Sequence, residues 1–321
     1  MTLLSIILAQ PRGFCAGVDR AIEIVDKALM LYGAPVYVRH EIVHNKWVVE
    51  DMRARGVVFV DDVAEIPDGA ITVFSAHGIS EKVENEAKLR SLPIIDATCP
   101  LVTKVHKEAQ RYETEGREII LIGHAGHPEV EGTSGRVQQV IHLVENARDV
   151  ETLNVQFPDK LAYVTQTTLS VDDTKEVIAA LKKRFPEIAG PELRDICYAT
   201  QNRQNAVRAL AGQVELLLVV GSKNSSNSNR LRDLAEEMGI AAYLIDEAKN
   251  LNPAWFDHVQ KVAITAGASA PEHLVQGVID AIGKIRPTQI STMEGTPERT
   301  RFKLPPEVTG ERLISATCAQ G

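Results

Sequence analysis

A pattern that occurs three times in the sequence limits the folds this chain can adopt more than any other feature. Each copy has a short apolar stretch, a cysteine and then apolar residues at helical spacing; the cysteines are Cys15, Cys99 and Cys197. The apolar stretch before Cys197, at 193–196, is the weakest of the three. We therefore expect each cysteine to lie where a strand ends and a helix begins.

The polar segments that follow each cysteine repeat as well. A turn lies 28 or 29 residues after each cysteine, and these turns contain His44, His127 and Ser225. A later apolar run in each copy ends in a second polar segment; these segments carry His77, Thr167 and Ser269. The nearly equal spacing indicates three copies of one α/β unit.

The apolar runs are uninterrupted, which is typical of strands in parallel sheets whose two faces are both buried. We predict an α/β fold of three quasi-equivalent lobes with parallel sheets around a central iron-sulfur cluster. The lobes are expected at 16–99, 100–196 and 197–284, with 1–15 completing the third. Several prolines and the end of the periodic pattern indicate an irregular tail over 285–321.

The placement of the cysteines predicts a metal cluster at the centre of the lobes. Ligands collect at the carboxyl ends of parallel strands, and a helix N-terminus favours the thiolate form of cysteine. Thiolates without a nearby second cysteine or histidine suit iron-sulfur better than zinc. Three cysteines would leave one iron of a cubane open as a Lewis acid. Cys318 lies in the tail, and we expect it to bind no metal.

The polar turns suggest an anionic ligand and a proton donor. Imidazole, hydroxyl and amide donors match phosphate oxygens, and the run 225–227 resembles an oxyanion loop at a helix start. Glu129, close to His127, is a candidate proton donor, and Thr167 a candidate to align a substrate. The remaining histidines outside the repeat are expected to be solvated; they are His40, His106, His142, His258 and His273.

The composition excludes several classes of protein. The sequence has 35 Lys and Arg against 43 Asp and Glu, a net charge of −8, which argues against a nucleic-acid binder or a membrane-surface protein. No apolar run approaches the roughly 18 residues of a membrane span, and we expect a cytoplasmic protein. The phosphate-binding and dinucleotide-binding glycine motifs are absent, so electrons would come from another protein.

Six segments together resemble the 4-hydroxy-3-methylbut-2-enyl diphosphate reductase family. The resemblance runs from Pro11 to about Gly283, and its motifs are P-R-G-F-C-A-G-V (11–18), D-A-T-C-P-L-V (96–102), G-H-A-G-H-P-E-V-E-G (123–132), T-Q-T-T-L-S (165–170), G-S-K-N-S-S-N-S-N-R-L (221–231) and T-A-G-A-S-A-P (265–271).

The resemblance implies a reductive dehydroxylation, the last step of the non-mevalonate isoprenoid pathway, which gives isopentenyl and dimethylallyl diphosphate. It implies that Cys15, Cys99 and Cys197 hold one 4Fe-4S cluster with an open iron, and that Glu129 is the proton donor. A ferredoxin or flavodoxin would supply electrons. The implied substrate-binding residues are His44, His77, His127, Thr167, Ser225, Ser226, Asn227 and Ser269.

Two other classes remain open from the residues alone. A hydro-lyase could use the same cluster only as a Lewis acid, and it would turn over without a reductant. A cluster-based redox sensor would have exposed thiolates, but it would need no polar pocket for a phosphate.

Overall fold

The computed structural model describes residues 3–310, so Cys318 lies outside the described residues. The described chain divides into two units. Unit 1 comprises residues 3–15, His44–Val48 and Cys197–Thr300, and unit 2 comprises Ala16–Val43, Val49–Ile196 and 301–310. Each unit is described by itself.

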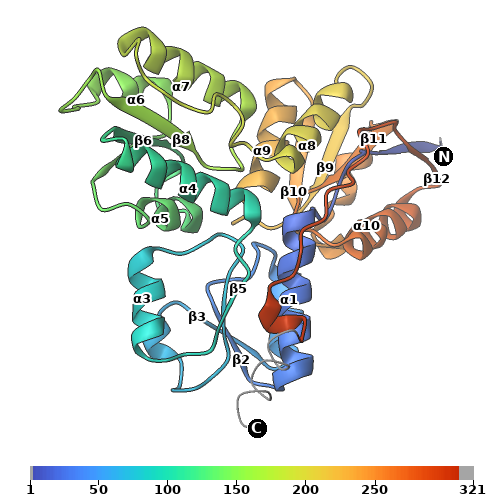
Figure 1. The fold of residues 1–321 in the computed structure, drawn as a ribbon. Coiled ribbons are helices and arrows are strands. Elements are labelled where there is room, and N and C mark those ends of the chain that lie inside the picture. The colour runs from blue at the N-terminus through green and yellow to red at the C-terminus, as the bar shows by residue number, and fades with distance from the viewer. Residues whose placement is uncertain (1–2, 311–321) are drawn as a thin grey trace. The chain divides into compact units, whose positions relative to one another are not determined.

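Unit 1 is built on one parallel sheet with the strand order β10-β9-β11-β1-β12 (Figure 1). Its strands are β1 (Leu4–Leu8), β9 (Leu216–Val220), β10 (Ala241–Ile245), β11 (Lys261–Ala266) and β12 (Thr288–Thr292). Its helices are α8 (Tyr198–Ala209), α9 (Ser226–Glu237) and α10 (Glu272–Ile285), with short 3-10 helices η2 (Ala248–Asn250) and η3 (Pro253–Phe256).

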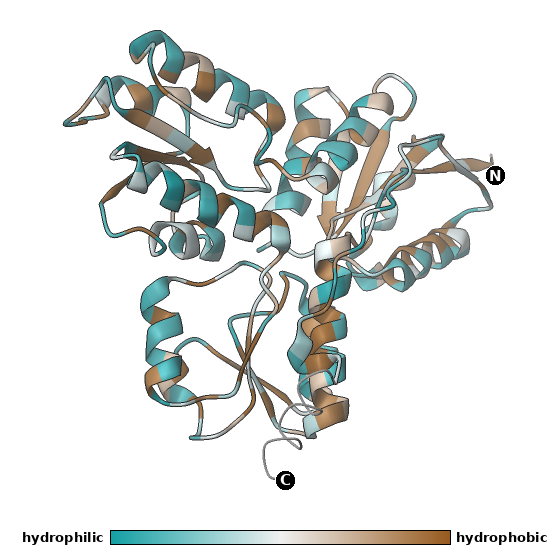
Figure 2. Ribbon diagram, viewed as in Figure 1, coloured by the Kyte–Doolittle hydropathy of each residue, from teal (hydrophilic) through white to brown (hydrophobic). Residues whose placement is uncertain are grey.

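Strand β9 shows why this sheet forms. All five of its residues are buried, and they alternate between two apolar clusters. Leu216 and Leu218 pack in a cluster with α10, whereas Leu217 and Val219 pack with α8 and α9. Each fully buried Leu or Val contributes roughly 1.5–3 kcal/mol relative to an exposed side chain. Strand β9 is brown in Figure 2 because every one of its residues is apolar.

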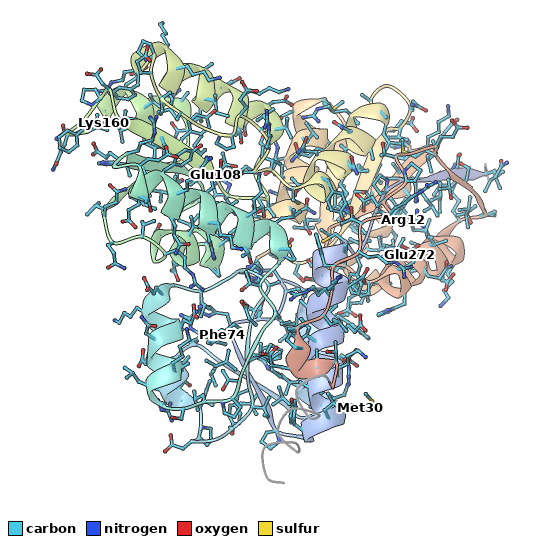
Figure 3. The ribbon with its side chains drawn as sticks, in the orientation of Figure 1. Arg12, Met30, Phe74, Glu108, Lys160 and Glu272 are labelled. Carbon is cyan, nitrogen blue, oxygen red and sulfur yellow. The ribbon has the colours of Figure 1, made fainter. Side chains whose placement is uncertain are left out.

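Unit 2 contains two smaller parallel sheets, with the orders β3-β2-β4-β5 and β7-β6-β8. The elements around the first sheet are α1 (Ala16–Tyr32), β2 (Val36–Arg39), α2 (Lys46–Ala54), β3 (Val57–Val60), η1 (Val63–Glu65), β4 (Thr72–Phe74), α3 (Glu81–Leu89) and β5 (Ile94–Asp96). Phe74 fills the core beside this sheet and is 2% exposed (Figure 3).

The second sheet of unit 2 is completed by four helices. The elements are α4 (Pro100–Thr114), β6 (Glu118–Ile122), α5 (Pro128–Ser134), β7 (Ile141–Val144), α6 (Ala147–Thr152), β8 (Leu161–Thr165) and α7 (Val171–Arg184), and the 3-10 helix η4 (Pro306–Val308) lies near the end of the described chain. Strands β6 and β8 are buried at every residue. Because β6 and β8 are parallel neighbours, the segments that follow them, 123–127 and 166–170, lie at the same edge of the sheet.

The predicted α/β class with three parallel-sheet lobes is confirmed. Strand β1 pairs with β11 and β12, so the N-terminal strand belongs to the sheet of residues 197–284. The exact lobe boundaries remain predictions. Within residues 3–310, every helix is too short or too polar to cross a bilayer.

Two local predictions were wrong. Residues 193–196 form turns and not a strand, because only Leu193 and Ile196 in this stretch are apolar. The tail expected over 285–321 is not irregular throughout, since β12 adds a parallel strand beside β1. The exposed, mostly polar residues of this edge strand leave no apolar pattern in the sequence.

Candidate active site

The three repeated cysteines each lie at the start of a helix. Cys99 and Cys197 are the N-cap residues of α4 and α8, and Cys15 immediately precedes α1. All three cysteines are free and half-buried as residues. The predicted helix starts are therefore correct, although a turn and not a strand leads into Cys197.

Cys15 and Cys197 belong to unit 1 and influence each other electrostatically. Desolvation and then the charge of Cys15 raise the pKa of the Cys197 thiol, to about 11, although hydrogen bonds with Thr200 act to lower it. Such thiols become thiolates readily when a cation offsets the charge, and iron is a cation that thiolate ligands select. The two side chains thus fit an iron-sulfur cluster.

Cys99 belongs to unit 2. Among residues 3–310, no group of three or more His, Cys, Asp or Glu side chains has the geometry of a single metal-ion site.

Glu129 is the most unusual carboxyl group of unit 2. It lies in the first turn of α5 and is 3% exposed. Its Oε1 accepts a hydrogen bond from the Thr167 backbone N–H at 2.6 Å, and its Oε2 accepts one from Thr167 Oγ1 at 3.0 Å. Burial raises the pKa of Glu129 to about 7, although both bonds from Thr167 act to lower it. The carboxyl group is therefore able to give or take a proton near neutral pH.

Asp195, which the sequence patterns did not single out, acts on Glu129 from a distance. Its side chain is fully buried, and it accepts hydrogen bonds from Lys104 Nζ at 3.1 Å and Thr165 N–H at 3.2 Å. Its negative charge is a further cause of the raised pKa of Glu129. No motif could have revealed this contribution, because Asp195 lies 66 residues from Glu129 in a stretch without a clear pattern.

His127 lies next to this carboxyl group in unit 2, and a second predicted histidine, His77, lies close to His127. His127 is the N-cap of α5, and its Nδ1 accepts the Glu129 backbone N–H at 3.1 Å. The proton of the neutral imidazole therefore resides on Nε2, which leaves that atom as a donor. The rings of His77 and His127 are 6.0 Å apart at 88°, so the structure brings these two predicted residues together.

Unit 1 gathers the remaining predicted polar residues near the ends of β9 and β11. Ser225 caps α9 by accepting the Ser228 N–H, and Ser226 is the first residue of that helix. Ser269 donates its hydroxyl to the His44 carbonyl at 2.8 Å. Lys46 N–H donates to Ser222 Oγ at 3.0 Å. The segment 44–48, which includes the start of α2, and the two strand-end loops are thus joined within one unit.

Asn227 shows the clearest sign of an absent ligand in this group. It is 4% exposed, and neither its Oδ1 nor its Nδ2 has a hydrogen-bond partner among residues 3–310. A buried amide without partners is costly, so a partner is expected to arrive with a ligand. The backbone of Gly267 approaches the start of α9 closely. A Cβ at Gly267 would lie 2.0 Å from Ser228 Oγ and 3.6 Å from Asn227 Nδ2.

Three histidines outside the site depart from their prediction. His40 and His142 are half-buried and lie beside the carboxylates of Asp61 and Glu118. His106 was expected to be solvated, but it is 5% exposed and its Nε2 is buried without a partner among the described residues. It packs against Gly78, where a Cβ would lie 2.5 Å from its Cε1. The helical spacing of 102, 105, 109 and 112 places residue 106 on the buried face, a signal that was available in the sequence.

Comparison with known proteins gives one consistent result. The LytB protein family model matches residues 6–283. The 4-hydroxy-3-methylbut-2-enyl diphosphate reductase of Pseudomonas putida strain W619 is 58% identical over 315 residues, covering 97% of this chain and 100% of that protein. These matches favour the predicted reductase over a hydro-lyase or a redox sensor.

Solved structures agree with this result. The E-1-hydroxy-2-methyl-but-2-enyl-4-diphosphate reductase from Plasmodium falciparum has a TM-score of 0.92 at 38% identity, covering 98% of this chain and 99% of that one. A structure described as (E)-4-hydroxy-3-methyl-but-2-enyl diphosphate reductase, the terminal enzyme of the non-mevalonate pathway, has a TM-score of 0.63 at 33% identity and covers 88% of this chain and 100% of that one.

Proposed function

The chain belongs to the LytB protein family, and from this premise we propose that it reduces (E)-4-hydroxy-3-methylbut-2-enyl diphosphate to isopentenyl and dimethylallyl diphosphate. The reaction is the last step of the non-mevalonate pathway, and the chain is an oxidoreductase. The observation that carries the proposal is a buried Glu129 with a pKa of about 7 that is held at both oxygens by Thr167.

We propose that Cys15, Cys99 and Cys197 hold one 4Fe-4S cluster with one iron lacking a protein thiolate. The shared position at a helix start and the electrostatic coupling of Cys15 with Cys197 support this assignment. When bound, the cluster would pass electrons one at a time from the reductant and provide a Lewis-acidic iron. Replacement of any of these three cysteines by Ser is expected to reduce iron and sulfide content, whereas Cys318→Ser is the matched control that keeps both.

The substrate diphosphate would be bound by neutral donors and histidines. The proposed residues are His44, His77, His127, Thr167, Ser225, Ser226, Asn227 and Ser269. Three observations support this set: the unpartnered amide of Asn227, the start of the 12-residue helix α9 next to it, and the Nε2 donor of His127. Backbone N–H groups at a helix start attract anions because the helix dipole is positive there.

Glu129 would supply the proton with which the substrate hydroxyl leaves as water. A carboxyl group with a pKa of about 7 is roughly half protonated at neutral pH, so it can donate and be reloaded. Thr167 fixes the orientation of the carboxyl through two hydrogen bonds. The reaction consumes two electrons and two protons; one proton leaves in water and the other forms the new C–H bond.

A separate reduced protein, such as a ferredoxin or flavodoxin, would deliver the electrons, and we propose a cytoplasmic location. The test is an anaerobic assay with the substrate, in the presence and absence of that reductant. We expect both diphosphate products only when the reductant is present. Turnover without any reductant would contradict the proposal and favour the hydro-lyase.

A further inference from the structure

Arg203 is a buried arginine six residues after Cys197, in helix α8 of unit 1. Its side chain is 0% exposed, which is rare for a charged residue. Its guanidinium forms an ion pair with the carboxylate of Glu298, whose side chain is 14% exposed. Nη1 lies 3.1 and 3.3 Å from the two carboxylate oxygens, and Nη2 lies 3.3 Å from Oε2.

The same guanidinium binds the backbone around both cysteines of this unit. Nη2 donates to the Gly13 carbonyl at 2.6 Å and to the Phe14 carbonyl at 3.3 Å. Nη1 donates to the Ala199 carbonyl at 2.9 Å. One side chain therefore joins the loop that ends at Cys15 to the first turn after Cys197.

Glu298 reaches this position from the segment that follows β12. That segment runs against the loop before Cys15: Met293 N–H donates to the Leu8 carbonyl at 3.0 Å, and a Cβ on Gly295 would lie 2.0 Å from the Gln10 carbonyl oxygen. Asn202 Nδ2 adds a hydrogen bond to Glu298 Oε1 at 3.0 Å. A chain segment about 280 residues beyond Cys15 thus packs on its loop.

We propose that Arg203 and Glu298 are positioning residues that hold the Cys15 loop against the start of α8, so that the thiols of Cys15 and Cys197 are arranged before any cluster binds. The inference rests on the proposed role of these cysteines as ligands. A buried ion pair is costly to desolvate, and apolar side chains of similar size often stabilise a fold as well. The planar fork of arginine is suited to holding several carbonyls and a carboxylate at once.

The exposed ion pair of the same loop provides a contrast. Arg12 Nη2 lies 2.6 Å from Glu272 Oε1, and the Glu272 side chain is 58% exposed (Figure 3). Water screens a pair of this kind, and it orders a loop weakly. We therefore assign the ordering of the Cys15 loop to Arg203 and Glu298.

The first experiment measures thiol accessibility in the full-length protein without cluster, under anaerobic conditions. Iodoacetamide is added, and mass spectrometry follows each cysteine separately. We expect Glu298→Gln to increase the alkylation rate of Cys15 about tenfold and to leave Cys99, in the other unit, unchanged. Glu237→Gln breaks a bidentate pair with Arg230 elsewhere in unit 1, in which the carboxylate is 52% exposed, and is the control, expected to change neither rate.

Equal acceleration of Cys15 and Cys99 in Glu298→Gln would overturn the inference, because it would indicate a general loss of structure. An unchanged Cys15 rate would overturn it as well. If Glu298→Gln does not fold, Asn202→Ala removes one bond to Glu298 and is tested in the same way, with a smaller increase at Cys15 expected. Glu298→Asp keeps the charge and should restore most of the protection.

The second experiment measures the reduction potential of the reconstituted cluster. Glu298→Gln leaves an uncompensated positive charge and should raise the potential, whereas Arg203→Gln removes that charge and should lower it. If the reduction potential shifted in the same direction in both variants, the shifts would reflect only a loosened Cys15 loop. That result would contradict a charged positioning pair. A parent protein without a cluster would refute the proposed function but would leave the alkylation result interpretable.

Discussion

Thr167 donates hydrogen bonds to both carboxyl oxygens of Glu129, from its backbone N–H at 2.6 Å and from its hydroxyl at 3.0 Å. Both donors favour the carboxylate, yet burial keeps the pKa of Glu129 raised, to about 7. The balance between these opposing effects determines the pH at which the proposed proton donor is charged.

The hydroxyl of Thr167 should therefore influence the pH dependence of kcat. A general acid must be protonated, so kcat falls as the pH rises through its pKa. Thr167→Ala removes a bond to the charged form, raises the pKa of Glu129 and should move this alkaline limb to higher pH. Thr167→Ser keeps the hydroxyl and should leave the limb in place.

Asp195→Asn should shift the pH dependence of kcat in the direction opposite to Thr167→Ala. The negative charge of Asp195 raises the pKa of Glu129, so its removal should lower that pKa and move the alkaline limb to lower pH. If the alkaline limb of the kcat–pH profile moved in the same direction in Asp195→Asn and Thr167→Ala, the fall in kcat would not reflect the titration of Glu129.

Asn227 should matter for binding but not for the stability of the ligand-free protein. Its buried amide has no partner among residues 3–310, so Asn227→Ala removes no hydrogen bond there. We expect an unchanged or higher melting temperature and a loss of roughly 1.5–3 kcal/mol in substrate binding, about ten- to over a hundredfold in Kd. A destabilised protein with unchanged Kd would place Asn227 in the core and not in the site.

His106 should make stability depend on pH. Burial and then the charge of Arg136 lower its pKa from 6.5 to about 4, so the folded protein favours the neutral ring. The contribution of the neutral His106 ring to the free energy of unfolding is fully present above pH 6.5 and is lost as the pH falls through 4. Its upper bound is about 3 kcal/mol. His106→Leu should flatten the pH dependence of the urea unfolding midpoint over this interval. An equally steep dependence in that variant would assign the effect to other groups.

The sequence predicted the elements that have strong apolar patterns. Strand β6 occupies Glu118–Ile122 as expected, because five consecutive buried residues leave a clear apolar run. Strand β12 was missed because an exposed edge strand with the sequence T-Q-I-S-T needs no such run. An uninterrupted apolar run identifies a strand only where both faces of the strand are buried.

The chemistry of the site was predictable from motifs, but its energetics were not. Glu129 could be named as a candidate from its position near His127, whereas its burial and its bonds to Thr167, 38 residues away, follow only from the tertiary structure. The pairing of Arg203 with Glu298 spans 95 residues. Periodicity carries no information about which distant charges are buried together.

The kcat of the Glu129→Gln variant tests the proposed proton donor most directly. The amide keeps the shape of the side chain but cannot deliver a proton. Under anaerobic conditions with saturating reductant, kcat should fall by about 10² to 10⁴, while iron content and substrate Kd stay at parental values. A parental kcat in Glu129→Gln would contradict the account and remove this carboxyl group from proton delivery.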